Sequence, residues 1–320
     1  MPVTQSQIKF YKSLYVNDTD YNGGRIGTEQ IVDSSMDNLF RNIQSEERIS
    51  GIDLYRKFFI KNENPSDIVL QNIRSSIANV NVSGDYFQFA IGTDDDYQGD
   101  AKNYTDWYGV GILVAEIIEG DSSFAIDFKQ ASGLPSDCLV SISDGIQASI
   151  LPMIGDPIWD GLQASVLISG EVPFTFAAGS IVSAVIELDD LTPLVANWTE
   201  ISSGGTYNES VYPLSVFNIG AISESWTLVF TSPTAFTVTG AVIGSVGSGT
   251  ISGDFNPING ASYYFRLLSA GWGGSWVLGD TITWTTRHAA RSLWVKESVP
   301  AGANVVDNNL CQINFKAESA

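Results

Sequence analysis

Residues 52–60 read IDLYRKFFI, and this stretch decides the fold class. Apolar side chains stand at every second position except at Arg56, and they are Ile52, Leu54, Phe58 and Ile60. A repeat of two residues places side chains on one face of a β-strand. Helical periodicity is nearly absent after Gly51, so we predict a mainly β protein.

Many short stretches of the same kind occur along the chain. Gly, Asp, Asn or Pro separates most of them, and they are residues 67–73, 86–91, 110–117, 124–128, 139–142, 165–168, 181–188, 212–217, 226–230, 236–242, 262–268, 281–285, 293–297 and 311–315. Short strands with turn signals between them indicate a β-sandwich or a barrel. Residues 240–254 are rich in Gly, Ser and Thr, which predicts an exposed loop or hairpin tip.

The N-terminal region combines a strand with an arm. Residues 8–16 alternate between apolar and polar side chains and predict a strand. Residues 18–27 contain a pair of glycines and predict a turn or an extended arm. Few apolar side chains anchor residues 16–27, so we expect this arm to be unordered in the free chain.

One stretch has helical periodicity. Its apolar residues follow the i, i+3, i+4, i+7 spacing of a single helical face, at Met36, Leu39, Phe40 and Ile43. Residues 45–48 are expected to add a last turn, and Gly51 is expected to end the helix.

The chain has 320 residues, which is long enough for two cores, since single cores seldom grow past roughly 250–300 residues. Residues 199–206 are rich in Ser and Gly, and this flexible composition predicts a boundary. We therefore predict two sandwich-like or barrel-like β domains with this division: an N-terminal strand and extended arm in 1–30, a β-sandwich with one short helix in 31–200, and a β-rich domain in 201–320.

Charge is distributed unevenly along the chain. The net charge is −20, which argues against direct nucleic-acid binding because such proteins need a basic footprint. Residues 1–74 hold nine of the 16 Lys and Arg, whereas residues 130–265 hold none and contain 12 acids. A solvated surface explains most single charges. The sharper hypothesis is that a partner docks near the N-terminus, on Arg41, Arg48, Arg56, Lys57 and Lys61.

No residue pattern points to catalysis. The single histidine, His288, would have to serve any Ser-His-Asp triad, and the chain contains no G-x-S-x-G motif. Paired carboxylates could serve a glycosidase, but nothing singles out an acid and a nucleophile. We expect the protein not to be an enzyme and to need no cofactor.

The best metal candidates are the acidic residues Asp94, Asp96 and Asp100, although a solvated acidic turn is the favoured interpretation. Cys138 and Cys311 lie far apart in sequence and are expected to be free thiols. No apolar run approaches the ~18–20 residues of a membrane helix, and the polar start predicts no signal peptide. We expect synthesis in the cytoplasm and no membrane partner.

Two parts of the chain are similar to a known family. The first part contains MDNLF at residues 36–40 and YRKFFIKN at residues 55–62. The second runs from Trp226 into the last residues and contains FTVTG at 236–240, AGWGGSW at 270–276 and GDTITW at 279–284. Together they resemble a family of tailed-bacteriophage virion structural proteins, encoded among head, neck and tail genes.

The resemblance implies a non-enzymatic virion part made in many copies. We expect a neck or collar component at the head–tail junction, or a tail part next to it. It would form a homo-oligomeric ring and bind other virion proteins, such as neck, portal, tail or capsid proteins, through its N-terminal arm and helix. The alternatives are a capsid decoration protein, a receptor- or glycan-binding tail protein, and a polysaccharide-degrading enzyme.

Overall fold

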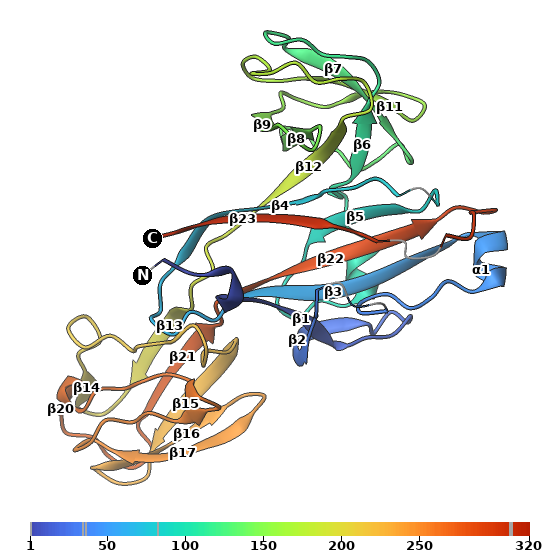
Figure 1. Cartoon of the computed structure of the whole chain (residues 1–320). Coiled ribbons are helices and arrows are strands. Elements are labelled where there is room, and N and C mark those ends of the chain that lie inside the picture. The colour runs from blue at the N-terminus through green and yellow to red at the C-terminus, as the bar shows by residue number, and fades with distance from the viewer. Residues whose placement is uncertain (1, 34, 36, 82, 307–309) are drawn as a thin grey trace.

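The computed structural model confirms the mainly β class and describes residues 2–33, 35, 37–81, 83–306 and 310–320. Three parts lie in a row (Figure 1). We call them the barrel lobe, residues 110–185, the C-terminal lobe, residues 194–287, and the body between them, which comprises the other described residues. Among the described residues, no helix is long and apolar enough to cross a membrane.

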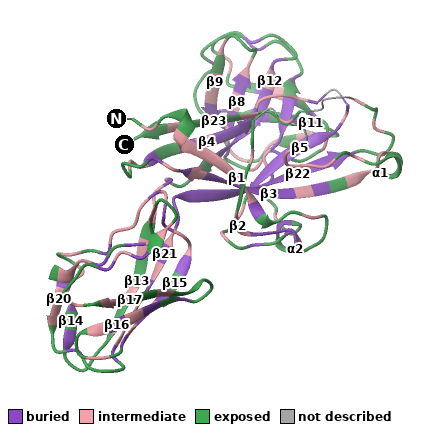
Figure 2. Cartoon of the chain, turned by 60° about the horizontal axis from the view of Figure 1, so that its bottom comes forward, coloured by how far each residue is buried: buried purple, intermediate pink, exposed green. Residues whose placement is uncertain are grey.

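The body contains a five-stranded antiparallel sheet in the order β2-β1-β3-β22-β5. Its strands are β1 Ile8–Tyr15, β2 Gly23–Gln30, β3 Ile52–Asn62, β5 Tyr86–Ile91 and β22 Ala290–Val299. The predicted strand at residues 52–60 is therefore the middle strand, β3. Because β3 is paired on both sides and covered on both faces, even its charged residues Arg56 and Lys57 are buried (Figure 2).

A second layer faces this sheet and makes the body a sandwich. It consists of β4 Leu70–Ile77, β23 Ile313–Ser319 and the end of β12 Ile181–Leu188. The core between the layers includes Phe58, Ile60, Ile73, Phe89, Ile186, Leu293 and Val295. The two ends of the described chain meet in this layer, where the amide of Val3 donates to the hydroxyl of Ser319 at 2.9 Å (Figure 1).

The barrel lobe is a strongly curved sheet around its own core. Its strands are β6 Val110–Leu113, β7 Ser123–Phe128, β8 Leu139–Ser143, β9 Ala148–Pro152, β10 Ile158–Asp160 and β11 Gln163–Leu167. A bridge between Met153 and Ile168 brings the β9 and β11 ends together. β12 joins the lobe to the body, because it pairs with β6 and β8 first and with β4 at its end.

The C-terminal lobe has an aromatic core beneath the sheet β13-β21-β15-β16-β17, with Trp226, Phe230, Phe265, Trp276 and Trp284 all buried. Its strands are β13 Leu194–Ile201, β14 Gly205–Tyr207, β15 Glu224–Phe230, β16 Ala235–Gly240, β17 Gly244–Thr250, β18 Ile258–Asn259, β19 Ser262–Tyr263, β20 Trp272–Gly274 and β21 Thr281–Arg287. The domain boundary that the composition predicted between residues 200 and 201 falls inside β13.

One loop of the C-terminal lobe fastens it to the body. The backbone amide of the buried Asn218 donates to the carboxylate of Asp67 at 2.8 Å, and its side-chain amide donates to the carbonyl of Ile68. The ammonium of Lys61 donates to the carbonyl of Ile219 at 3.0 Å. After the lobe, the chain returns to the body, where β22 pairs with β3 and β5 and β23 pairs with β4.

The helix predicted at residues 36–48 is wrong over most of its length. α1 is Ser45–Ser50, so only the expected last turn is helical, and it ends at Gly51 as predicted. Residues 37–40 form a turn and bends, residues 41–43 have no regular structure, and Met36 lies outside the described residues. The cause is tertiary: Leu39 and Phe40 pack against the sandwich core, which overrides the helical spacing. The remaining helical turns are α2 Gln98–Ala101 and the 3-10 turns Gln5–Gln7 and Ser269–Gly271.

The predicted arm at residues 18–27 is instead part of a folded hairpin. β2 pairs with β1, and Asn22 in the connecting turn is fully buried. The side-chain amide of Asn22 donates to the carbonyl of Tyr55 at 2.8 Å. A buried asparagine thus replaces the apolar anchors whose absence suggested disorder. The strand expected at residues 212–217 is reduced to one bridge, whereas the expected tip at 240–254 contains β17.

Candidate docking groove

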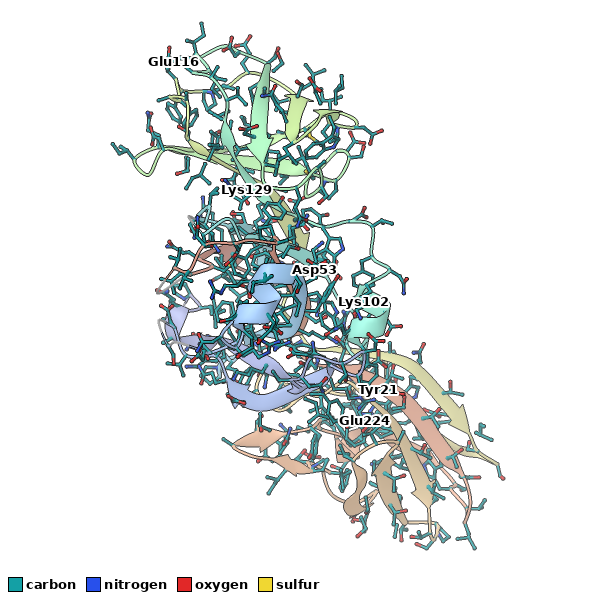
Figure 3. All side chains as sticks on the ribbon, turned by 90° about the vertical axis from the view of Figure 1, so that its right-hand side faces the viewer. Tyr21, Asp53, Lys102, Glu116, Lys129 and Glu224 are labelled. Carbon is teal, nitrogen blue, oxygen red and sulfur yellow. The ribbon has the colours of Figure 1, made fainter. Side chains whose placement is uncertain are left out.

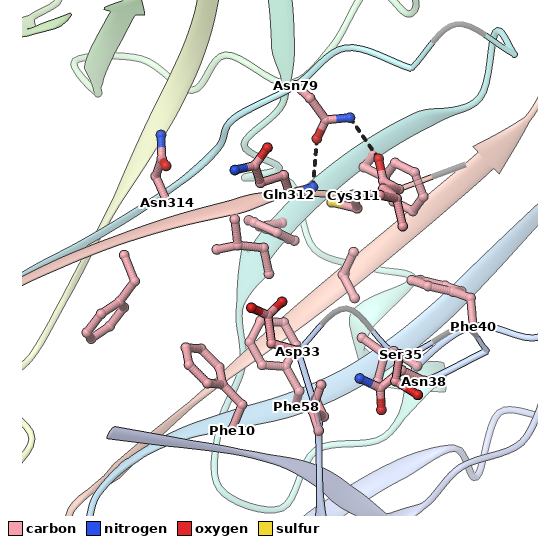
Figure 4. Close-up of a pocket in the computed structure, with 18 of the residues that line it drawn as sticks. Phe10, Asp33, Ser35, Asn38, Phe40, Phe58, Asn79, Cys311, Gln312 and Asn314 are labelled. Carbon is pink, nitrogen blue, oxygen red and sulfur yellow. Dashed lines mark hydrogen bonds between the residues drawn. The ribbon is translucent and has the colours of Figure 1, made fainter. Parts of the chain in front are cut away.

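A groove of about 2480 Å³ lies between the five-stranded sheet and β23. Small-molecule pockets usually measure about 300–1,000 Å³, so this groove has the size for a polypeptide segment. Figure 4 shows Phe10 and Phe58 on one side of it and Cys311, just before β23, on the opposite side. The described lining is mixed. Its apolar members include Phe10, Leu39, Phe40, Phe58, Phe89, Val295, Ile313 and Phe315, and about as many polar and charged residues line the groove with them.

The alternation of β23 provides one wall of the groove. Ile313 and Phe315 are half-buried and pack against the sandwich core, whereas Asn314 and Lys316 between them are exposed. The rings of Phe315 and Phe10 meet edge to face with 6.1 Å between centroids. The two layers of the sandwich therefore touch at Phe10 and Phe315.

Asn79 fixes the start of β23. Its side-chain amide donates to the carbonyl of Leu310 at 2.7 Å, and its carbonyl oxygen accepts from the amide of Gln312 at 2.6 Å (Figure 4). The neighbouring Cys311 is a free thiol, as is Cys138 in the barrel lobe. Burial raises the pKa of the Cys311 thiol, and the nearby negative charge of Glu297 adds to this effect.

A buried carboxyl group lies at the same end of the groove. Glu297 on β22 is only 5% exposed, and its side-chain carboxyl group forms no hydrogen bond or ion pair with any described residue. Burial, and secondarily the charge of Asp85, raise the pKa of Glu297 to about 7, against a smaller opposite effect of Arg56 and Arg41. Glu297 is therefore poised to accept a cationic group.

The five cations proposed as partner contacts fall into two groups, buried and accessible. Arg56 and Lys57 are buried, and their contacts lie within the chain: Arg56 pairs with Asp18 at 2.6 Å and Lys57 with Asp96 at 2.6 Å. Those two side chains consequently present no free charge to a partner.

The other three cations are more accessible. Arg41 pairs with Asp18 and Glu47, and Lys61 pairs with Glu63 at 3.2 Å. Arg48 donates weakly to the hydroxyl of Ser45 at 3.5 Å. Arg41 and Arg48 line the groove, so the partner-contact hypothesis stands for them as a prediction.

The three aspartates considered for metal binding have separate structural tasks. Asp96 accepts from the indole of Trp294 at 2.6 Å in addition to its pair with Lys57. Asp94 accepts from the hydroxyl of Ser223 at 2.6 Å, and Asp100 accepts from the amide of Tyr97 at the start of α2. Within the described part of the chain, no group of three His, Cys, Asp or Glu residues could hold a metal ion.

The single histidine is buried between the body and the C-terminal lobe. His288 is 3% exposed, packs edge to face on Phe59, and lies 3.9 Å from Asp94. Burial lowers the pKa of His288 to about 4, although the nearby carboxylate of Asp94 acts in the opposite direction. This environment accounts for a neutral, structural imidazole.

Sequence reasoning did not find the groove. Its walls come from β1 on one side of the sequence and from β22 and β23 on the other, so almost the whole chain lies between them. The available signals were the alternation at residues 311–315 and the carboxylate of Glu297 within the strand that follows residue 290. Neither signal shows which strands become neighbours.

No family model matches the chain, and no curated protein matches it. Among solved structures, VP17, a capsid protein of bacteriophage P23-77, has a TM-score of 0.16 and 9% identity, over 78% of this chain and 88% of VP17. The vicilin from Solanum melongena has a TM-score of 0.13 and 9% identity, over 96% of this chain and 85% of the vicilin. At these scores, the chain has only a weak likeness to a phage capsid protein and to a seed storage protein.

Proposed function

We propose that this chain is a non-enzymatic structural protein of a tailed-phage virion, where it binds other virion proteins. The open groove along β23 is the observation that supports this role most directly, because a groove of that size, with both apolar and polar lining residues, favours a polypeptide partner over a small molecule. The sequence resemblance of residues 36–62 and 226–302 to virion proteins supports the same role.

The finer proposal is a neck or collar ring at the head–tail junction. Three β modules in a row give the subunit separate surfaces for its two neighbours, as heterologous contacts in a closed ring require (Figure 1). The barrel lobe also carries nine Asp and Glu and a single Lys between residues 110 and 180. Figure 3 places Glu116 at the outer end of that lobe and Lys129 near the body.

Electrostatics would then help to fix the order of subunits. None of the barrel-lobe carboxylates between residues 110 and 180 forms an ion pair with a described residue. Unpaired surface charge of one sign favours a neighbour of the opposite sign and disfavours a wrong register.

Copy number per virion tests the proposal. Quantitative mass spectrometry of purified particles should find around a dozen copies for a neck or tail ring, in line with closed cyclic symmetry. Hundreds of copies would instead indicate a capsid decoration protein. Absence from the particle would overturn the virion role.

A receptor- or glycan-binding tail protein is the second candidate, because tyrosines gather on the surface. Tyr15, Tyr21 and Tyr97 are 49%, 77% and 37% exposed, and ring centroids lie 6.4 Å apart for Tyr15–Tyr97 and 6.5 Å apart for Tyr21–Tyr97. Binding of the isolated protein to host cells would support this candidate if Tyr21→Ala abolishes it. Tyr263→Ala is the control, since Tyr263 is 40% exposed on the C-terminal lobe.

A further inference from the structure

β23 is the edge strand of its sheet, which ends in the order β12-β4-β23. The amide of Ala78 donates to the carbonyl of Gln312 at 2.7 Å, so Gln312 is a hydrogen-bonded position of the antiparallel ladder. In such a ladder the bonded positions alternate along the strand. The backbone groups of Ile313 and Phe315 therefore point away from β4, and no described strand pairs with that edge.

The same edge runs along the groove. The side chains of Ile313 and Phe315 line it together with Phe10 and Leu39. A further strand bonded to this edge would direct every second side chain toward these apolar groups, as in strand addition to an exposed sheet edge. The register shift between Lys316 and Glu318 limits regular pairing to the first half of β23.

At one end of the groove, Glu297 adds a chemical requirement for any segment that binds there. Its carboxyl group is nine-tenths buried, lines the groove, and has no partner among the described residues. A buried carboxylate is stabilised strongly by a cation placed beside it. The charge of Glu297 contributes to the raised pKa of the Cys311 thiol. Glu297 therefore lies close to Cys311, which precedes β23 in the chain.

We propose that the groove binds one extended segment of another virion protein, which pairs with the free edge of β23 at Ile313 and Phe315. The segment has alternating apolar side chains and places a Lys or Arg beside Glu297. The inference rests on the proposed virion function and names the class of partner at the same site. A second copy of this chain is a poorer source, because its cation-bearing strands β1 and β3 are paired inside the body, and Lys316 on its free edge strand β23 lies on the exposed face, opposite Ile313 and Phe315.

Hydrogen exchange with single-residue resolution tests the pairing. The isolated chain is compared with the chain in purified virions. The amides of Ile313 and Phe315 should exchange about tenfold or more slowly in the virion, because strand pairing protects them. The amide of Asn314 is the internal control, since it faces β4 and should be protected in both states. Equal exchange of Ile313 and Phe315 in both states would overturn the inference.

Two pairs of variants, supplied in trans during infection, test the chemistry. Glu297→Gln keeps the shape and removes the charge, and it should reduce the copies per particle about tenfold. Glu209→Gln, which alters a partly exposed carboxylate on the C-terminal lobe outside the groove, should be incorporated like the wild type. Ile313→Pro removes an edge-facing amide and should reduce incorporation more than Ile313→Ala, which removes only the side chain.

The melting temperature of each variant separates docking from folding. Glu297→Gln should melt no lower than the wild type at neutral pH, because it removes a buried charge. Normal incorporation of Glu297→Gln would contradict the inference about the groove but not the proposed virion function. Absence of the wild-type chain from particles would contradict the proposed virion function itself. Crosslinks from Lys316 to a second copy of the chain would overturn the choice of partner.

Discussion

The ammonium nitrogen of Lys57 lies 2.6 Å from a carboxylate oxygen of Asp96, and both side chains are buried. Lys57 also donates to the carbonyl of Gly24 at 2.7 Å, and Asp96 accepts from the indole of Trp294 at 2.6 Å. The pair therefore joins β3, β22 and the β1–β2 hairpin on the face of the sheet opposite the groove. Burial lowers the pKa of Lys57, while Asp96 acts against that change.

Replacing Lys57 by Met should lower the free energy of unfolding by about 3–5 kcal/mol, because Asp96 is then left as an unpaired buried charge. Lys102→Met is the matched control. Lys102 pairs with Asp20 at the same 2.6 Å, but both side chains are exposed to solvent. Its loss should change the free energy by under about 1 kcal/mol. Urea denaturation measures both values, and similar losses for the two variants would contradict the prediction.

Gly23→Ala should destabilise the hairpin more than Gly120→Ala does. Both glycines have positive φ angles, 110° and 96°, so both variants carry backbone strain of about 1–2 kcal/mol. At Gly23, however, a methyl group would lie 2.7 Å from the ring of Trp294 and 2.9 Å from the carbonyl of Asp96, whereas nothing lies within 4 Å at Gly120. The expected additional loss is about 1–3 kcal/mol, and thermal unfolding of both variants measures it.

Stability should depend on pH through Glu297. Its pKa is raised from 4.5 to about 7 in the folded chain, so the folded state binds the extra proton between these values. The associated stability is complete below pH 4.5 and is lost as the pH rises through about 7. A pKa change of this size corresponds to about 3 kcal/mol.

Comparison with Glu297→Gln isolates this effect from the other carboxyl groups. The unfolding free energy of the variant minus that of the wild type should rise by about 3 kcal/mol between pH 4.5 and pH 8. Urea denaturation at a series of pH values provides the difference. A difference that is constant with pH would show that Glu297 titrates normally.

His288 should remain neutral throughout the physiological range. Burial lowers its pKa to about 4, so the folded state releases a proton that the unfolded state holds between pH 4 and 6.5. His288 therefore adds a loss of stability as the pH falls through this window. The chain has one histidine, and the NMR signal of its imidazole can be assigned directly. A titration midpoint near 6.5 in the folded protein would contradict the burial argument.

Local pattern was sufficient for several elements of the fold. The alternation in residues 52–60 predicted β3. The patterns in residues 86–91 and 181–188 predicted β5 and β12 with their observed bounds. These strands were readable because apolar and β-branched side chains fit a pleated surface wherever it occurs in a chain. The chain's low charge and high aromatic content similarly favoured packed β structure.

Local pattern failed where tertiary contacts replaced local ones. The spacing of Leu39 and Phe40 suits a helix, but both side chains instead fill the border of the sandwich core. Residues 18–27 lack apolar anchors, but the buried Asn22 fixes them by hydrogen bonds. A polar anchor of this kind depends on acceptors from β3, which the sequence of the hairpin cannot reveal.

By itself, then, the sequence determined the β class, many of its strands, the acidity of the chain and the absence of a recognisable catalytic motif. Only the tertiary structure decided that β22 and β23 return to the first strands, and that they leave the groove and the unpaired edge between them. The physical reason is that side-chain alternation is a local property, whereas strand neighbours and buried charges such as Glu297 depend on contacts between residues far apart in the chain.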